Sequence, residues 1–173
     1  MSARVILFLD VDGVLNHHQS FKDAPYLGQS SSKIIDRDCL ARLRYLVEAT
    51  GADIVLSSTW RLYDQNCATL TSHGIQWIGK TPDLAYSRDS HGVFVTRPRR
   101  DEIMQWLDEH DPNREALVLV LDDDGGAGLR SNGRKSAFIK TKFTEGGLTD
   151  THVAAAIRWV ERQRTAALPR LGS

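Results

Sequence analysis

The sequence has few cysteines, no long hydrophobic run and no excess of charge of either sign. Cys39 and Cys67 are too few for a disulfide framework, and the chain does not open like a signal peptide, so we expect a cytoplasmic protein. The longest apolar run is far shorter than the roughly 20 residues that a membrane helix needs, so we expect no association with a membrane. With 22 basic and 22 acidic residues, the chain is not built for general attraction to nucleic acid, although a local basic patch is still allowed.

The length and the hydrophobic pattern predict one α/β domain over residues 1–173. Short apolar runs typical of buried strands alternate with segments whose apolar residues recur at helical spacing. Such alternation implies right-handed crossovers and a three-layer, Rossmann-like parallel sheet. The expected strands are 6–9, 54–56, 75–78, 117–121 and about 136–141, and the expected helices are about 37–50, 60–73, 100–110 and 150–162.

Two polar stretches interrupt this pattern. Residues 16–32 are expected to form an irregular loop or flap over the site, and residues 79–98 a short insert whose Gly92–Thr96 portion could add a strand or hairpin. Neither is large enough for a separate cap domain. Residues 125–128 are expected to be a mobile loop, and about 165–173 a frayed tail.

The stretch Ile6–Leu15 carries the strongest chemical signal. Asp10 and Asp12 follow directly after an apolar strand, and Gly13 beside them allows a sharp turn or a close approach of the backbone. Burying a carboxylate costs several kcal/mol unless it is paired or bound to a cation. Taken alone, Asp-x-Asp-Gly is equally compatible with a capped turn. A calcium loop is excluded, because Leu15 stands where such a loop needs glycine.

Polar residues recur where the other expected strands end. Ser57 and Ser58 follow the second strand, and Asp122 and Asp123 follow the LVLVL strand. Because the carboxyl ends of parallel strands share one edge, these groups are expected to converge with Asp10. Carboxylates without nearby histidine or cysteine form a hard-oxygen site suited to Mg²⁺, and the added hydroxyls suggest phosphate chemistry.

These motifs resemble the haloacid dehalogenase (HAD) superfamily. The matching segments are ILFLDVDGVLN, IVLSSTWR and LVLVLDDD, and the resemblance covers nearly the whole chain. SSTWR, RRDEIMQWL and GLTDTHVAAAI further resemble a small capless group related to HAD domains in RNA-repair proteins. The resemblance implies a HAD-like fold without a separate cap domain.

The resemblance also implies catalytic roles. Asp10 would be the nucleophile that forms an aspartyl-phosphate, and Asp12 the general acid and then the base. Ser57 or Ser58 would hydrogen-bond the transferring phosphoryl group. The implied Mg²⁺ ligands are Asp10, the main-chain carbonyl of Asp12, and Asp122 or Asp123.

The position that usually holds a lysine in this superfamily departs from the pattern. The candidates here are three arginines, Arg97, Arg99 and Arg100. Arg99 is favoured because it precedes Glu102 by three residues, as in the capless group, and a guanidinium can pair with aspartate and phosphate together. Lys80 is a weaker candidate, and Arg97 and Arg100 fit a solvated helix start.

The function expected from the sequence is an Mg²⁺-dependent phosphomonoesterase. Without a lid, the site would accept a bulky phosphorylated substrate such as a nucleic-acid end, or use a partner subunit as its lid; the oligomeric state is not predicted. The alternative is a non-catalytic HAD-like module that binds phosphate or regulates a partner, and a dehalogenase is a distant third.

Trp60 could stack on a base, although a core position is favoured, and His17 and His18 fit surface positions better than substrate contacts.

Overall fold

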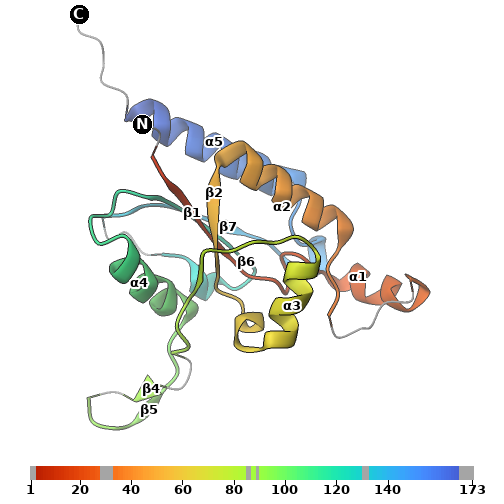
Figure 1. Ribbon diagram of the computed structural model, residues 1–173, viewed down its shortest axis with the longest axis horizontal. Coiled ribbons are helices and arrows are strands. Elements are labelled where there is room, and N and C mark those ends of the chain that lie inside the picture. Colours follow the sequence, from red (N-terminus) through yellow and green to blue (C-terminus); the bar gives the residue numbers. More distant parts are fainter. Residues whose placement is uncertain (1–2, 28–32, 85–86, 89, 130–132, 168–173) are drawn as a thin grey trace, which may run out of the picture.

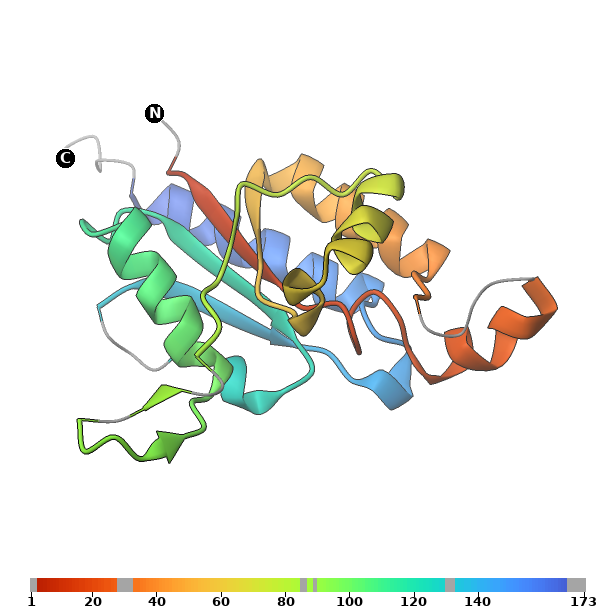
Figure 2. The same cartoon turned by 60° about the horizontal axis from the view of Figure 1, so that its bottom comes forward.

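A five-stranded parallel sheet with the strand order β3-β2-β1-β6-β7 forms the centre of the protein (Figure 1). The computed structural model describes residues 3–27, 33–84, 87–88, 90–129 and 133–167. Antiparallel β4 and β5 form a separate hairpin that projects away from the sheet in Figures 1 and 2. The strands are β1 Val5–Leu9, β2 Ala52–Leu56, β3 Gly79–Lys80, β4 Ser87–Arg88, β5 Phe94–Val95, β6 Leu117–Asp122 and β7 Lys135–Lys140.

Helices and short 3₁₀ turns connect these strands. The α-helices are α1 His18–Asp23, α2 Arg37–Thr50, α3 Asp64–Ser72, α4 Arg99–His110 and α5 Asp150–Ala166. The 3₁₀ turns are η1 Ala24–Leu27, η2 Thr59–Leu62, η3 Gly125–Ala127 and η4 Phe143–Glu145. Asp36 begins α2 by accepting hydrogen bonds from two backbone N–H groups, and Gly51, at a φ of 65°, ends it.

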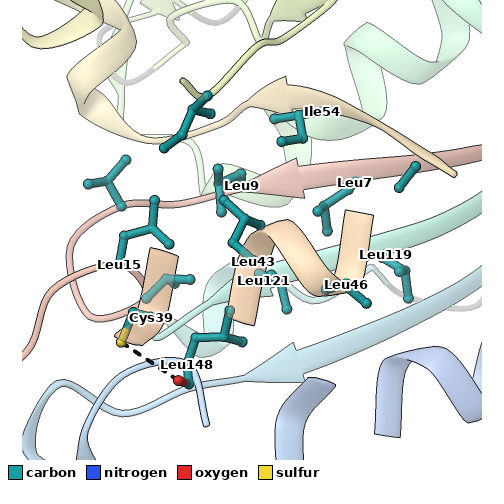
Figure 3. Packing of buried hydrophobic residues seen from close by; sticks show 14 of the residues in the cluster. Leu7, Leu9, Leu15, Cys39, Leu43, Leu46, Ile54, Leu119, Leu121 and Leu148 are labelled. Carbon is teal, nitrogen blue, oxygen red and sulfur yellow. Dashed lines mark hydrogen bonds between the residues drawn. The ribbon is translucent and has the colours of Figure 1, made fainter. Parts of the chain in front are cut away.

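The central strands β1, β2 and β6 are buried on both faces, which confirms the predicted three-layer architecture. Figure 2 shows α4 on one face and α2 and α5 on the other. Alternate side chains of β1 point to opposite layers, because side-chain direction has a period of two along a strand. Leu7 and Leu9 pack toward α2 and α5, as Figure 3 shows, whereas Ile6 and Phe8 pack toward α4.

Several expected elements differ from the structure. Residues 16–32 are not wholly irregular, because this stretch contains α1 and η1; residues 28–32 lie outside the described part. The single helix expected over 60–73 is η2 followed by α3, and the break falls at Tyr63, whose backbone is extended. Residues 125–128, expected to be a loop, contain η3.

The third strand lies at β3 and not at 75–78. Ile75 is buried, whereas Ile78 is exposed and its amide donates to the Ile54 carbonyl of β2 at 2.8 Å, so hydrogen bonding to β2 starts only at the end of the apolar run. β3 itself pairs only with Val55 and Leu56 at the edge of the sheet. Because both residues of β3 are at most half-buried, the strand lacks the hydrophobic pattern by which strands are recognised.

The insert 79–98 contributes β3 and the β4–β5 hairpin, which confirms the short hairpin suggested around Gly92–Thr96. Within the described residues there is no separate cap domain. α5 continues to Ala166, beyond the expected onset of fraying, and residues 168–173 lie outside the described part. No helix in the described part is long and apolar enough to cross a bilayer.

Candidate active site

The ends of β1, β2 and β6 lie side by side because the three strands are in register. Leu9 pairs with Leu56 of β2 and with Leu121 of β6. The next residues in the chain, Asp10, Ser57 and Asp122, therefore stand at the same level. Leu9, Leu56 and Leu121 all face the α2 and α5 layer, so strand alternation turns the following three side chains to the α4 face. The convergence predicted from the sequence is present.

Three carboxylates form the centre of this edge. Asp10, Asp122 and Asp123 each offer an oxygen, and the three oxygens lie within 4.8 Å of one another. Asp10 is 5% exposed and Asp122 fully buried. Asp122 Oδ1 accepts a hydrogen bond from the Asp124 amide at 2.8 Å, whereas its buried Oδ2 has no hydrogen-bond partner. An unpartnered buried carboxylate oxygen beside two further carboxylates is a feature that a cation would satisfy.

Arg99, the first residue of α4, supplies positive charge to these acids. Its Nη1 donates to Asp10 Oδ1 at 2.5 Å and lies 3.3 Å from Asp122 Oδ2, too poorly aligned for a hydrogen bond but close enough for an ion pair. The other basic candidates lie elsewhere: Lys80 Nζ donates to the Arg61 carbonyl, and Arg100 is close to Asp101. The structure thus brings the favoured arginine to the acids.

Burial raises the pKa of all three carboxyls, and the charge of Asp10 raises the pKa of Asp122 and Asp123 further. For Asp10, burial outweighs the Arg99 guanidinium and the Ser58 hydroxyl, which act in the opposite direction, so the pKa is raised. For Asp122, burial and then the charge of Asp10 raise the pKa to about 7. The same two causes raise the pKa of Asp123. The single guanidinium does not fully compensate for three clustered acids.

The two serines differ in their surroundings. The Ser57 hydroxyl is buried and has no hydrogen-bond partner. The Ser58 hydroxyl lies close enough to Asp10 to lower the pKa of that carboxyl, and it accepts a bond from the Trp60 amide at 3.3 Å. Both hydroxyls therefore lie at the acid cluster, and the free Ser57 hydroxyl is the one with an unused hydrogen bond.

Gly13 closes the turn that carries the first acids. Its φ is +78°, and a Cβ at this position would overlap the Asp123 carboxylate. The Gly13 carbonyl accepts a hydrogen bond from Thr141 Oγ1 at 2.7 Å, which ties the turn to the end of β7. Glycine is needed here for both its backbone conformation and its missing side chain.

Asp12 lies apart from the acid cluster in a different environment. Its Oδ1 accepts a hydrogen bond from Asn16 Nδ2 at 2.8 Å, and its Oδ2 accepts one from Trp60 Nε1 at 3.0 Å. Trp60 is 5% exposed, so the core position favoured from the sequence is confirmed, but its indole N–H also reaches the site. Asn16 was missed, although it closes the ILFLDVDGVLN motif.

A buried ion pair, also missed from the sequence, joins the serine turn to α4. Arg61 Nη2 donates to Glu102 Oε2 at 2.8 Å, and both side chains are almost fully buried. The same guanidinium donates to the carbonyls of Ser57, Ser58, Thr81 and Pro82. Glu102 lies one turn after Arg99, so this pair fixes the start of α4 relative to the serines.

A second group of potential metal ligands, His17, Asp36 and Cys39, is better explained by helix capping. Asp36 caps α2 and lies 3.3 Å from His17 Nε2. Cys39 Sγ donates weakly to the Leu148 carbonyl (Figure 3), and burial, with the charge of Asp36, raises the thiol pKa to about 11. His17 is half-buried, contrary to the expected surface position, whereas the neighbouring His18 is exposed.

A groove of about 650 Å³ is lined by Arg99, the residue that pairs with Asp10, although Asp10, Asp122 and Asp123 do not themselves line it. Tyr63, 62% exposed, lies on its η2 side, and Arg97 precedes α4 on the other. Residues that line the groove include Thr59, Tyr63, Arg97, Pro98, Arg99 and Asp124. The groove therefore runs from Arg99 at the acid cluster to a surface that carries an aromatic ring and a further cation.

The ends of β1, β2 and β6 bring two acids and a hydroxyl together at one edge of a parallel sheet, and the described part has no separate cap domain. This arrangement is that of a HAD-superfamily domain. A family model described as the HAD domain in Swiss Army Knife RNA repair proteins matches residues 6–153. The chain belongs to this family, which indicates a phosphatase-like hydrolase. Searches of curated proteins and of solved structures found no match.

Proposed function

We propose that the protein is an Mg²⁺-dependent phosphomonoesterase that forms an aspartyl-phosphate on Asp10. The observation that carries this proposal is the meeting of Asp10, Asp122 and Asp123 with Arg99 at one edge of the sheet. The buried Ser57 hydroxyl and the buried Asp122 Oδ2 both lack a hydrogen-bond partner, which supports a site made for an anion and a cation together.

The residues that would hold Mg²⁺ are Asp10, Asp122 and Asp123, with the main-chain carbonyl of Asp12. All offer oxygen ligands, the type that Mg²⁺ prefers, and the HAD family generally uses this ion. When bound, Mg²⁺ would neutralise phosphoryl charge and so allow a carboxylate to approach a phosphate.

In the first step, a carboxylate oxygen of Asp10 attacks phosphorus and the bond to the leaving oxygen breaks. Asp12 gives its proton to that oxygen, so the leaving group departs as an alcohol. Asp12 then accepts a proton from water, which attacks the phosphorus of the aspartyl-phosphate. The bond to Asp10 breaks and inorganic phosphate is released. Arg99 and the hydroxyl of Ser57 or Ser58 would bind the phosphoryl oxygens throughout.

We further propose that the substrate is bulky, such as a phosphorylated nucleic-acid end. Three features support it: the described part has no cap domain to enclose a small substrate, the groove is open, and Tyr63 and Arg97 suit a base and a second phosphate. The family takes its description from RNA repair proteins, which is consistent with this class.

The test measures phosphate release from p-nitrophenyl phosphate and from 3′-phosphorylated oligonucleotides, with Mg²⁺ and with EDTA. We expect Mg²⁺-dependent release by the wild type and none above background by Asp10→Asn. Equal rates in the two proteins would remove Asp10 from the mechanism. Thermal stabilisation by Mg²⁺ and phosphate without turnover of any substrate would instead favour the non-catalytic alternative.

A further inference from the structure

The side chain of Trp60 makes a contact that the catalytic roles above do not explain. Its indole Nε1 donates to Asp12 Oδ2 at 3.0 Å, although the two residues are 48 positions apart in the chain. The rest of the indole is buried in the hydrophobic core with side chains of β1 and α2. A core tryptophan needs a partner for its N–H, and here that partner is the proposed acid.

The direction of this N–H is fixed by the surroundings of Trp60. Its backbone amide donates to Ser58 Oγ, and its carbonyl accepts a weak bond from Cys67 Sγ. A buried ring held in this way has little rotational freedom, so the indole N–H is a rigid donor from the motif that also carries the two serines.

Asn16 holds the other oxygen of the same carboxyl. It is fully buried, and its Nδ2 donates both to Asp12 Oδ1 and to the Ile34 carbonyl, while its Oδ1 accepts from the Gly13 amide at 3.1 Å. The Asp12 carboxyl is therefore held at both ends. Each oxygen has two lone pairs, so one N–H bond on each oxygen leaves a lone pair free for a transferred proton.

We propose that Trp60 is a positioning residue, which acts through Asp12 to direct the acid toward the leaving oxygen. This inference rests on the proposed phosphatase function and adds a specific part to it. Asp12 is exposed, so without the indole N–H its carboxyl retains only the Asn16 bond and can rotate about its side-chain torsions. Loss of the indole N–H should therefore slow proton transfer to the leaving group and leave phosphate binding unchanged, because, among the described residues, the Trp60 side chain forms no hydrogen bond with Ser57, Ser58 or Arg99.

The test compares substrates that differ in their need for a proton. Nitrophenolate leaves without protonation, whereas the alkoxide of an alkyl phosphate or of an oligonucleotide 3′-phosphate must be protonated. For Trp60→Phe we expect kcat/KM to fall about tenfold on alkyl phosphates and less than about threefold on p-nitrophenyl phosphate, because the acid loses one of the two hydrogen bonds that orient it. Trp106→Phe is the matched control: this buried tryptophan packs on Phe8 in the other layer, so its replacement should affect both substrates equally.

A double-mutant cycle separates positioning from general damage. If Trp60 acts only through Asp12, Trp60→Phe should have no further effect on alkyl phosphates in the Asp12→Asn background. Equal losses on both substrate types, or full additivity with Asp12→Asn, would overturn the proposal. Should Trp60→Phe fold poorly, benzothienylalanine at position 60 keeps the ring shape and replaces the N–H with sulfur.

A measurement without turnover distinguishes this inference from the proposed function. In a ¹H–¹⁵N spectrum, the indole resonance that Trp60→Phe removes should shift in Asp12→Asn and stay in place in Trp106→Phe. An unshifted resonance would refute the contact whether or not the enzyme is active. If the resonance shifts in Asp12→Asn but the wild type releases no phosphate, the contact exists, and both the phosphatase function and the positioning of an acid are refuted.

Discussion

Replacing Asp122 with asparagine should stabilise the protein in the absence of metal. Burial and the charge of Asp10 raise the pKa of Asp122 from the ordinary 3.8 to about 7. The folded protein therefore holds this proton to a higher pH than the unfolded chain does. Stability from this group is complete below about pH 4, declines as the pH rises through about 7, and is constant above about pH 8.

The size of the effect follows from the pKa difference. Each pKa unit is worth about 1.4 kcal/mol, so raising the pKa from 3.8 to about 7 corresponds to about 4 kcal/mol lost between about pH 4 and about pH 8. The asparagine side chain of the variant would carry no charge at any pH, and one of the three clustered negative charges would be removed. We expect Asp122→Asn to exceed the wild type by about 2–4 kcal/mol at about pH 8 in EDTA, the lower figure applying where Asp10 takes up the shared proton.

Urea unfolding followed by circular dichroism, at several values between about pH 5 and about pH 8, provides the measurement. Asp53→Asn is the control, because Asp53 lies at the opposite end of β2 in an exposed pair with Arg4, which is worth at most about 1 kcal/mol. Mg²⁺ at about 100 times its dissociation constant should stabilise the wild type by about 2.7 kcal/mol and Asp122→Asn much less. A wild type in EDTA whose stability does not fall over this range, or an Asp122→Asn variant that is the less stable protein at about pH 8, would refute the reasoning.

Three further predictions address other parts of the site. Gly13→Ala should lower the unfolding free energy by about 2 kcal/mol or more and reduce phosphate release, because its Cβ would strain the turn and displace Asp123; an unchanged melting temperature would contradict this. Arg61→Lys should cost about 3 kcal/mol in urea unfolding, since an ammonium cannot replace a guanidinium that binds four carbonyls and Glu102; a loss below about 1 kcal/mol would show that the pair is unimportant. Cys39 should react with a disulfide reagent at about pH 8 far more slowly in the folded protein than in urea, because it is buried and its pKa is raised to about 11, and equal rates would place the thiol at the surface.

The sequence was sufficient to predict the central sheet and the meeting of the acids at its edge, because the apolar runs and the polar residues that end them determine both. Each central strand is an apolar run that ends in a polar residue, and parallel pairing in register brings these ends to the same level. The structure places Arg99 beside Asp10, because a helix start at this residue brings its side chain over the edge where Asp10 lies; its role in place of the usual lysine stays a prediction.

The contacts of Asp12 could not be predicted in the same way. Trp60 is 48 residues away from Asp12, and its position depends on a short 3₁₀ turn where a continuous helix was expected. Likewise, the Arg61–Glu102 pair joins two segments whose distance depends on how α4 packs. The hydrophobic periodicity of a sequence predicts the face of a helix or strand on which a side chain lies, but it does not predict which hydrogen-bond donor from another segment contacts that side chain. The strand β3 was misplaced for a related reason, since an edge strand of two residues has too little buried surface to leave a pattern.

The charges at the strand ends explain why the site needs a cation in addition to Arg99. The three carboxylates together carry a charge of about −3 when ionised, and Arg99 offsets one of these. A phosphate monoester arrives with nearly two more negative charges, into a site where Asp10 and Asp122 are almost fully buried. Protonating Asp122, as its pKa of about 7 allows in the metal-free protein, removes one negative charge but also removes a metal ligand. A divalent cation among the three acids would let all of them ionise and leave Arg99 free to pair with the phosphoryl group. The same repulsion that is expected to destabilise the metal-free protein would therefore give the site an affinity for the proposed Mg²⁺.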